Sequence, residues 1–262
     1  MNKQELIKKI PSAESIYVIY SQITKMPYVS CHEETFDDFI YIYFDSEKAK
    51  AHAMKLNEEK IPTAVIKCEE AKVLLFLADL RFMGINAMCF VDEEEVMIQH
   101  KELLTFPEET EETIKKKPVD NPSLHLSILY LMQEVRRPIE KEKKVNVAHL
   151  EEETSANIYK GKFLLPVQAQ TGETPTEGQE VKTSVMLLKN DKDEMFVPLL
   201  TDFPELRKFL KDKNSQVVVA NFEGVMKVIK GSTTAGVVIN PASSNVVLNK
   251  LGMLSIEKRF KE

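Results

Sequence analysis

The chain has 262 residues, of which 43% are hydrophobic and 29% charged, and its formal net charge is -6. This composition is typical of globular proteins and excludes collagen-like repeats and extensive disorder. The negative charge repels phosphates and anionic lipid head groups, which argues against nucleic acid and membranes as partners. The length favours two domains over one.

The first residues carry no recognisable export signal, because Lys8, Lys9 and Pro11 stand where a signal peptide has its apolar core. No later stretch approaches the roughly 18 uninterrupted apolar residues of a membrane-spanning helix. We therefore expect a cytoplasmic protein. The chain has 3 cysteines, an odd number without a Cys-x-x-Cys pair, so a disulfide framework is not expected.

The first half alternates apolar, β-branched runs, which predict strands, with segments of helical periodicity. Asp45 or Ser46 follows one strand and is placed to cap the next helix through its side-chain oxygen. Gly84 is a natural helix stop. The expected order is a strand at 15–20, a short meander near 26–30, a strand at 38–44, a helix at 47–59, a strand at 63–66, a helix at 69–82 and a strand at 87–91.

The segment 105–120 differs in character from the rest of the chain. It has few apolar residues, many Glu and Lys, and prolines at 107 and 118. Such a segment buries little surface and is typical of a solvated connection. We place the domain boundary here, between an N-terminal domain at 1–112 and a C-terminal domain at 113–262.

The second half again predicts alternating strands and helices. Asn121-Pro122 opens a helix that runs to about Arg137, and Pro166 places the strand 162–167 at a sheet edge or a strand end. The tail 246–260 fits either a helix or a strand. Between them we expect a hairpin of strands 183–188 and 195–200, a short helix beginning at 201–202, a strand at 216–220, a helix within 222–229 and a strand at 236–239.

Both halves share one order: an apolar strand, an Asp, an amphipathic helix, a β-rich strand, a second helix and a further strand. Duplication explains this order, and so does the chance recurrence of common α+β connections. In either case the predicted fold class is α+β, with two similar domains, each a mixed or antiparallel sheet packed with helices.

The usual signatures of catalysis and cofactor binding are missing from the sequence. With only 8 glycines, the chain has no Gly-rich phosphate loop and no Gly-x-Ser-x-Gly nucleophile elbow. The densest group of metal donors is Cys31-His32-Glu33-Glu34, but successive residues of an extended segment point to opposite sides. We expect no catalytic residues, no cofactor and no metal site.

The candidate residues for ligand or partner binding lie in turns that follow strands. Asp45 and Asp202 occupy equivalent places in the two halves, although helix capping explains both without any chemistry. The basic stretch from Arg136 to Lys144 is a further candidate, for nucleic acid, but Glu140 and Glu142 interrupt it and favour a solvated mixed-sign segment. The candidate set is Asp45, Thr201, Asp202, Asn240 and Pro241.

The second half resembles the SseB-like family of bacterial proteins, named for an enhanced serine sensitivity phenotype. The resemblance rests on the runs FVPLLTD at 196–202 and GVVINP at 236–241, with LPV at 165–167 and VVL at 246–248, and it covers roughly 121–254. It implies the fold of this half and no established catalytic residue. The first half departs from the pattern, with Asp45 after Phe44 and Asp92 after Val91, which makes it a divergent repeat if it is one.

Together these features predict a non-enzymatic cytoplasmic module that binds another protein or a small regulatory ligand. The alternative is an enzyme whose site is assembled from distant residues: Asp45, Thr201, Asp202, Asn240 and a histidine. Convergence of these side chains in a concave pocket would favour the enzyme.

Overall fold

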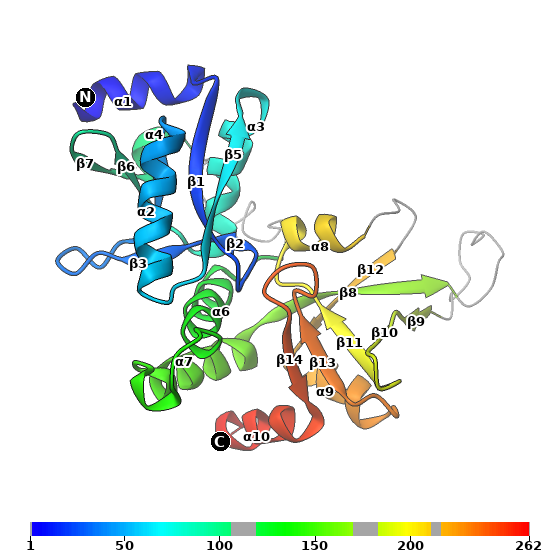
Figure 1. Ribbon diagram of the computed structural model, residues 1–262. Helices are drawn as coiled ribbons and strands as arrows, with labels where there is room; N and C mark the ends of the chain where they lie inside the picture. Colours follow the sequence, from blue (N-terminus) through cyan, green and yellow to red (C-terminus); the bar gives the residue numbers. More distant parts are fainter. Residues whose placement is uncertain (1, 106–118, 170–182, 211–215, 262) are drawn as a thin grey trace, which may run out of the picture. The chain divides into compact units, whose positions relative to one another are not determined.

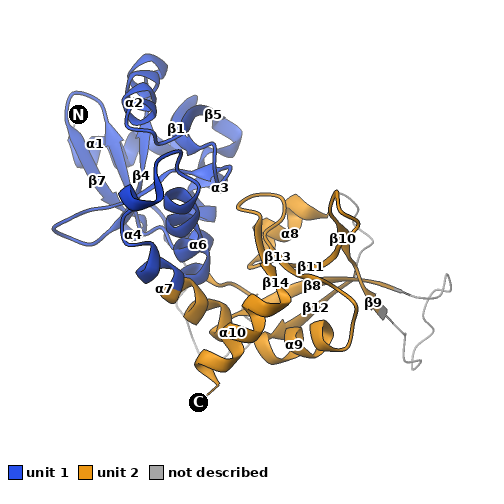
Figure 2. Ribbon diagram, turned by 60° about the horizontal axis from the view of Figure 1, so that its bottom comes forward, with its two compact units in different colours: residues 1–117, 122–151 blue, residues 118–121, 152–262 orange. Residues whose placement is uncertain are grey.

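We describe the protein from a computed structural model, which covers residues 2–105, 119–169, 183–210 and 216–261. The chain divides into two compact units, Met1–Lys117 with Pro122–Glu151, and Pro118–Asn121 with Glu152–Glu262 (Figure 2). The boundary predicted at 112/113 lies outside the described residues and stays a prediction. None of the described helices is long and apolar enough to cross a membrane.

The strands described in unit 1 form one mixed sheet (Figure 1). Strand β1 pairs antiparallel with β2, β4 and β5, while β4 also pairs antiparallel with β3 and parallel with β6, which pairs antiparallel with β7. The bounds are β1 (Ser15–Ser21), β2 (Met26–Pro27), β3 (Val29–Cys31), β4 (Asp38–Tyr43), β5 (Thr63–Glu69), β6 (Ala87–Val91) and β7 (Glu95–Gln99).

Helices cover both faces of this sheet. On one face Ile40 and Met88 belong to a core cluster with residues of α1, α3 and α6, and on the other Ile19 and Tyr43 pack with Ala53 of α2. The helices are α1 (Lys3–Lys9), α2 (Ser46–Glu58), α3 (Glu70–Asp79), α4 (His100–Leu103), α6 (Pro122–Val135) and α7 (Val147–Lys160), the last of which continues into unit 2, with short 3-10 turns η1 (Ile10–Ser12), η2 (Leu80–Met83) and η3 (Lys141–Lys143).

The elements expected in the first half are present, and β7, α1 and α4 are additional to them. Helix α6 belongs to unit 1, because Leu129 is fully buried in the core of that unit. Gly84 ends η2 with φ +77, and a Cβ atom there would lie 2.6 Å from the Pro122 carbonyl oxygen. A glycine at this position therefore permits both the turn and the close approach of α6.

Unit 2 contains two smaller sheets in its described residues (Figure 1). One has the strand order β10-β11-β13-β14, with β11 and β13 parallel, and the other the order β12-β8-β9. A bridge between Leu164 and Leu200 joins them. The strands are β8 (Lys162–Ala169), β9 (Thr183–Val185), β10 (Leu188–Lys189), β11 (Met195–Leu199), β12 (Gln216–Asn221), β13 (Gly236–Ile239) and β14 (Val246–Asn249), and the helices are α8 (Phe203–Phe209), α9 (Phe222–Lys230) and α10 (Lys250–Phe260).

Two expectations for this half were wrong. Strand β8 is central in its sheet, so Pro166 is neither at an edge nor at a strand end. A proline is accommodated there because its missing N–H group falls just beyond the end of β9, where Met186 donates to the Pro166 carbonyl oxygen at 2.9 Å. The strand expected at 183–188 is divided into β9, which pairs with β8, and β10, which pairs with β11.

The connectivity of the two units corresponds strand for strand. In unit 1 β1 pairs with β5, and β4 runs parallel to β6, which pairs with β7. In unit 2 β8 pairs with β12, and β11 runs parallel to β13, which pairs with β14. The predicted α+β class is therefore confirmed, while the origin of the two units by duplication stays a prediction.

Candidate functional site: a tyrosine-lined pocket in unit 1

Three of the residues singled out in the sequence meet inside unit 2. The Asn240 side chain accepts from the Thr201 amide at 3.0 Å and donates to the Thr201 hydroxyl at 2.9 Å. That hydroxyl lies 2.7 Å from a carboxylate oxygen of Asp202, to which it donates its proton. Asn240 has φ +49, which asparagine tolerates better than most residues.

This network extends to residues that the sequence did not single out. Asp202 caps α8 by accepting from the Glu205 amide at 2.8 Å, and the Glu205 carboxylate accepts from the Ser243 hydroxyl at 2.5 Å and from Lys208 at 2.6 Å. Two carboxylates three residues apart in sequence, those of Asp202 and Glu205, are therefore buried, each with hydrogen-bond donors, as buried charge requires.

The network is closed to solvent. The side chains of Thr201, Asp202 and Asn240 belong to residues with 0% exposure, so a substrate has no access to them in this structure. Pro241 is partly exposed beside it, and Asp45 lies in unit 1, where it caps α2 through the Glu47 and Lys48 amides. The predicted set is thus not one site, and a binding role for these residues stays a prediction.

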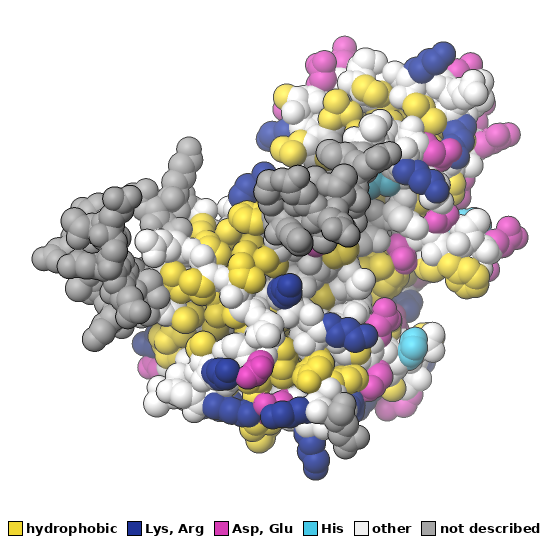
Figure 3. All heavy atoms as spheres, turned by 180° about the vertical axis from the view of Figure 1, so that it is seen from behind, with side chains coloured by type: hydrophobic (Ala, Val, Ile, Leu, Met, Phe, Trp, Pro, Cys, Tyr) yellow, Lys and Arg dark blue, Asp and Glu magenta, His cyan; other side chains and the backbone are white. Residues whose placement is uncertain are grey.

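The basic stretch at the end of α6 is a mixed-sign segment. Lys143 pairs with Glu140 at 2.9 Å and Arg137 with Glu134 at 3.6 Å. On the face drawn in Figure 3, basic and acidic side chains are likewise interspersed. Within the described residues, no group of three or more His, Cys, Asp or Glu side chains could hold a metal ion.

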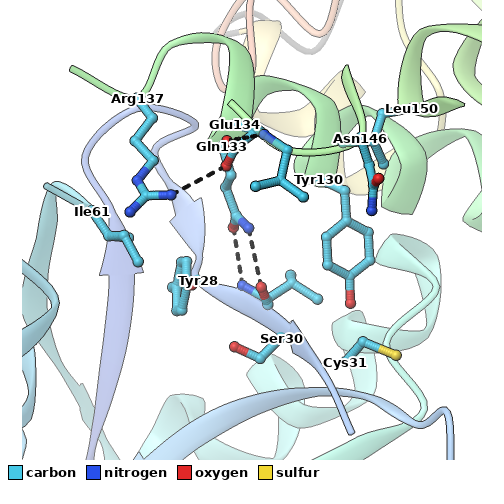
Figure 4. Close-up of a pocket in the computed structure, with 12 residues that line it drawn as sticks. Tyr28, Ser30, Cys31, Ile61, Tyr130, Gln133, Glu134, Arg137, Asn146 and Leu150 are labelled. Atoms are coloured by element: carbon cyan, nitrogen blue, oxygen red, sulfur yellow. Dashed lines mark hydrogen bonds and ion pairs between the residues drawn. The ribbon is translucent and has the colours of Figure 1, made fainter. Parts of the chain in front are cut away.

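A concave site lies elsewhere in unit 1, between β3, α6 and the segment that leads into α7 (Figure 4). We call it the tyrosine pocket. Its volume is about 410 Å³, within the range of ligand sites, which is roughly 300–1,000 Å³. Its walls include Tyr28, Tyr130, Gln133, Arg137, Val145 and Leu150.

The tyrosine pocket faces the outer edge of β3. Residues from both faces of this strand line it, from Tyr28 to Cys31. The Gln133 side chain accepts from the Val29 amide and donates to the Val29 carbonyl, both at 3.0 Å, as the peptide groups of a neighbouring strand would do (Figure 4). Gln133 therefore occupies one position of this edge, with which none of the described strands pairs.

The next position along this edge belongs to Cys31. Successive residues of an antiparallel strand point their backbone groups alternately toward and away from the partner. Since Val29 points away from β4, Cys31 also directs its N–H and C=O to the outer edge. Asp38, which lies opposite Cys31, supports this geometry, because its amide and carbonyl bond to Asn86 on its other side at 2.8 and 3.0 Å.

An ion pair fixes the rim of the tyrosine pocket. Glu134 accepts from the Val145 amide at 2.8 Å and pairs with Arg137, which donates to the Glu59 carbonyl at 2.7 Å. These contacts tie the segment after η3 to α6 and place the Val145 side chain, 58% exposed, at the rim. The walls are thus pre-formed, which lowers the entropic cost of binding.

The pKa values of Cys31 and Tyr130 in the tyrosine pocket are both raised. Burial and the nearby Asp38 and Asp37 carboxylates raise the pKa of the Cys31 thiol, so it remains protonated, whereas a nucleophilic cysteine needs a lowered pKa. Burial raises the pKa of Tyr130, as does its 2.6 Å hydrogen bond to Asp38. This chemistry suits binding by apolar contact and hydrogen bonds.

The tyrosine pocket was not predicted from the sequence, because its walls come from distant parts of the chain: Gln133 and Val29, which bond to each other, are 104 residues apart in sequence. One feature of the sequence pointed to this surface. Tyr130, Gln133, Glu134 and Arg137 follow the i, i+3, i+4, i+7 spacing of a single helix face. A polar stripe on an otherwise apolar helix indicates a surface with partners, but it does not identify which strand lies opposite.

Comparison with known proteins concerns mainly unit 2. The family model for the SseB protein N-terminal domain matches residues 144–250. This match confirms the resemblance of the second half to the SseB-like family and covers α7 to β14, whereas most of the tyrosine pocket lies before it. No curated protein matches the chain.

Two solved structures are similar over most of the chain. The first, "Anabaena Tic22 (protein transport)", is 12% identical and has a TM-score of 0.24, with 90% of this chain and 93% of that one covered. The second, "Tic22 from Plasmodium falciparum", is 9% identical and has a TM-score of 0.23, with 98% and 97% covered. TM-scores this low give no basis for carrying fold details or function to this chain.

Proposed function

We propose that this protein, whose residues 144–250 match the SseB protein N-terminal domain, is a non-enzymatic binding module that holds an extended segment of a partner protein in the tyrosine pocket of unit 1. The observation that carries the proposal is the outer edge of β3, which lies inside a cavity walled by Tyr28 and Tyr130. The cytoplasmic location expected from the sequence is part of the proposal.

The backbone supports an extended occupant. Gln133 already bonds the backbone N–H and C=O of Val29, and Cys31 offers the next N–H and C=O on the same edge. A peptide that adds to a sheet edge gains affinity from main-chain hydrogen bonds and specificity from pockets for alternate side chains. The sheet edge at β3 is short, which limits its tendency to pair with other sheets indiscriminately.

The side chains around this edge support an amphipathic segment. Tyr28, Ile61 and Leu150 supply apolar surface, and the Glu134–Arg137 pair offers a polar contact at the rim. Tyrosine contributes a large contact area with few rotatable bonds, so little conformational entropy is lost on binding. An uncharged stretch with one aromatic or aliphatic anchor fits this lining best.

The proposal is tested by selecting binders from a displayed library of random 12-residue peptides and measuring their dissociation constants. Val145→Asp places a charge at the rim, and we expect at least a tenfold loss of affinity, about 1.4 kcal/mol. The matched control is Val247→Asp in unit 2, where the valine is 53% exposed. Enrichment of no peptide, or equal loss in both variants, would overturn the proposal.

Strand addition has a signature of its own. N-methylation of successive amides in a selected peptide should weaken binding most at the one residue that pairs with Cys31, because Gln133 already occupies the Val29 position of the β3 edge. A flat profile along the peptide contradicts an extended, paired occupant. Substrate turnover that is lost in Glu134→Gln would contradict the non-enzymatic part of the proposal.

A further inference from the structure

A second cavity lies within unit 2, where three chain segments meet. Its volume is about 590 Å³. The walls come from the junction of α7 and β8, the start of α9 and the end of α10. We call it the lysine cavity, because Lys160, Lys162 and Lys261 line it.

The lysine cavity carries an excess of positive charge, although the chain as a whole carries -6. Two acidic residues also line it, but each is paired with lysine: Glu223 pairs with Lys227 at 2.9 Å, and Glu257 pairs with Lys230 at 2.6 Å and with Lys261 at 3.7 Å. Among the described residues, no ion pair involves Lys160 or Lys162.

Helix ends explain part of this charge. Lys160 is the last residue of α7 and Lys261 follows α10, and cations are favoured at helix C-termini. The charge of Lys162 has no such explanation, because this residue begins β8, where it pairs with Asn221. Lys160 and Lys162 line the same cavity, and two ammonium groups around one concave site attract an anion more strongly than either would alone.

An aromatic surface lies beside these lysines. The Tyr159 ring is 5.1 Å from the Phe222 ring and 5.8 Å from the Phe260 ring, measured between centroids. Tyr159 and Phe222 both line the cavity. Rings in this arrangement offer contact area to a further flat group.

We propose that the lysine cavity binds a small organic anion in which a carboxylate or phosphate group is joined to a flat apolar group. The anionic group lies between Lys160 and Lys162, and the flat group packs against Tyr159. This site is separate from the tyrosine pocket, so its occupancy does not depend on the function proposed for unit 1.

The experiment is a titration of the full-length protein followed by NMR or calorimetry, with phenyl phosphate and phenylacetate as probes. Binding of either supports the proposal, and the stronger of the two identifies the anionic group. Inorganic phosphate tests the anion without the ring, and benzyl alcohol tests the ring without the charge. We expect both to bind at least about tenfold more weakly, because each lacks half of the recognition.

The variant Lys160→Met, Lys162→Met should lose at least about tenfold in affinity for the better probe. Lys189→Met, Lys192→Met removes the same charge from the end of β10 and the turn after it, outside the cavity, and should bind as the parent does. Equal loss in both double variants, benzyl alcohol binding as tightly as the anions, or no probe binding below about 10 mM would overturn the proposal.

Discussion

At the scale of single residues, the two aspartates that cap helices have the same role but differ in burial. Asp45 and Asp202 both follow a strand and cap the next helix. Asp45 is exposed, whereas Asp202 has 0% exposure and also accepts from the Thr201 hydroxyl. Removing an exposed capping side chain costs the fold little stability. Removing a buried one costs more, because its partner groups are left without hydrogen bonds.

We therefore expect Asp202→Ala to lower the free energy of unfolding by about 3 kcal/mol and Asp45→Ala by about 1 kcal/mol. Urea denaturation of the two variants, followed by circular dichroism, measures the difference. Equal losses would mean that the buried network around Thr201 adds nothing to the cap.

At the scale of elements, the pairing of β13 with β14 includes a close backbone contact that a side chain would disturb. Gly236 in β13 pairs with Asn249 of β14, and a Cβ atom added to it would lie 2.0 Å from the Leu248 carbonyl oxygen. Gly252, in the first turn of α10, has room, because its added Cβ atom would meet nothing nearer than 3.4 Å.

These two glycines predict effects of opposite sign. Gly236→Ala should destabilise the protein by at least about 2 kcal/mol, because the backbone of β14 must shift. Gly252→Ala should stabilise it by roughly 0.5 to 1 kcal/mol through helix propensity. Denaturant midpoints of both variants test this, and a neutral Gly236→Ala would show that β14 yields without cost.

At the scale of the whole molecule, the unit boundary is set by where α6 packs. This helix follows the segment 106–118 in the chain, yet it buries Leu129 in the core of unit 1 and joins Gln133 to β3. Asn121, just before it, bonds instead to Lys162 and Thr201 of unit 2. Sequence proximity therefore does not decide membership of a unit here.

A fragment of residues 1–151 should accordingly unfold cooperatively, whereas a fragment of residues 1–121 should not, because it lacks the apolar face of α6. Thermal unfolding followed by near-ultraviolet circular dichroism compares the two. A cooperative transition in the shorter fragment would show that α6 is dispensable for the core of unit 1.

The sequence alone determined the α+β class, most strands and helices, and the helix ends at Asp45 or Ser46, at Asp202 and at Gly84; the structure decided for Asp45. These features depend on local periodicity and on the backbone preferences of single residues, which can be recognised from the sequence itself. The family resemblance of the second half was likewise carried by short local runs at 196–202 and 236–241.

Only the tertiary structure decided that Thr201, Asp202 and Asn240 are closed to solvent, that Gln133 occupies the edge of β3, and that Lys162 lines a cavity. Burial, edge pairing and concavity depend on which distant segments pack together, and that choice is made by the whole core. A sequence read residue by residue shows what each side chain could do, and packing decides what it meets.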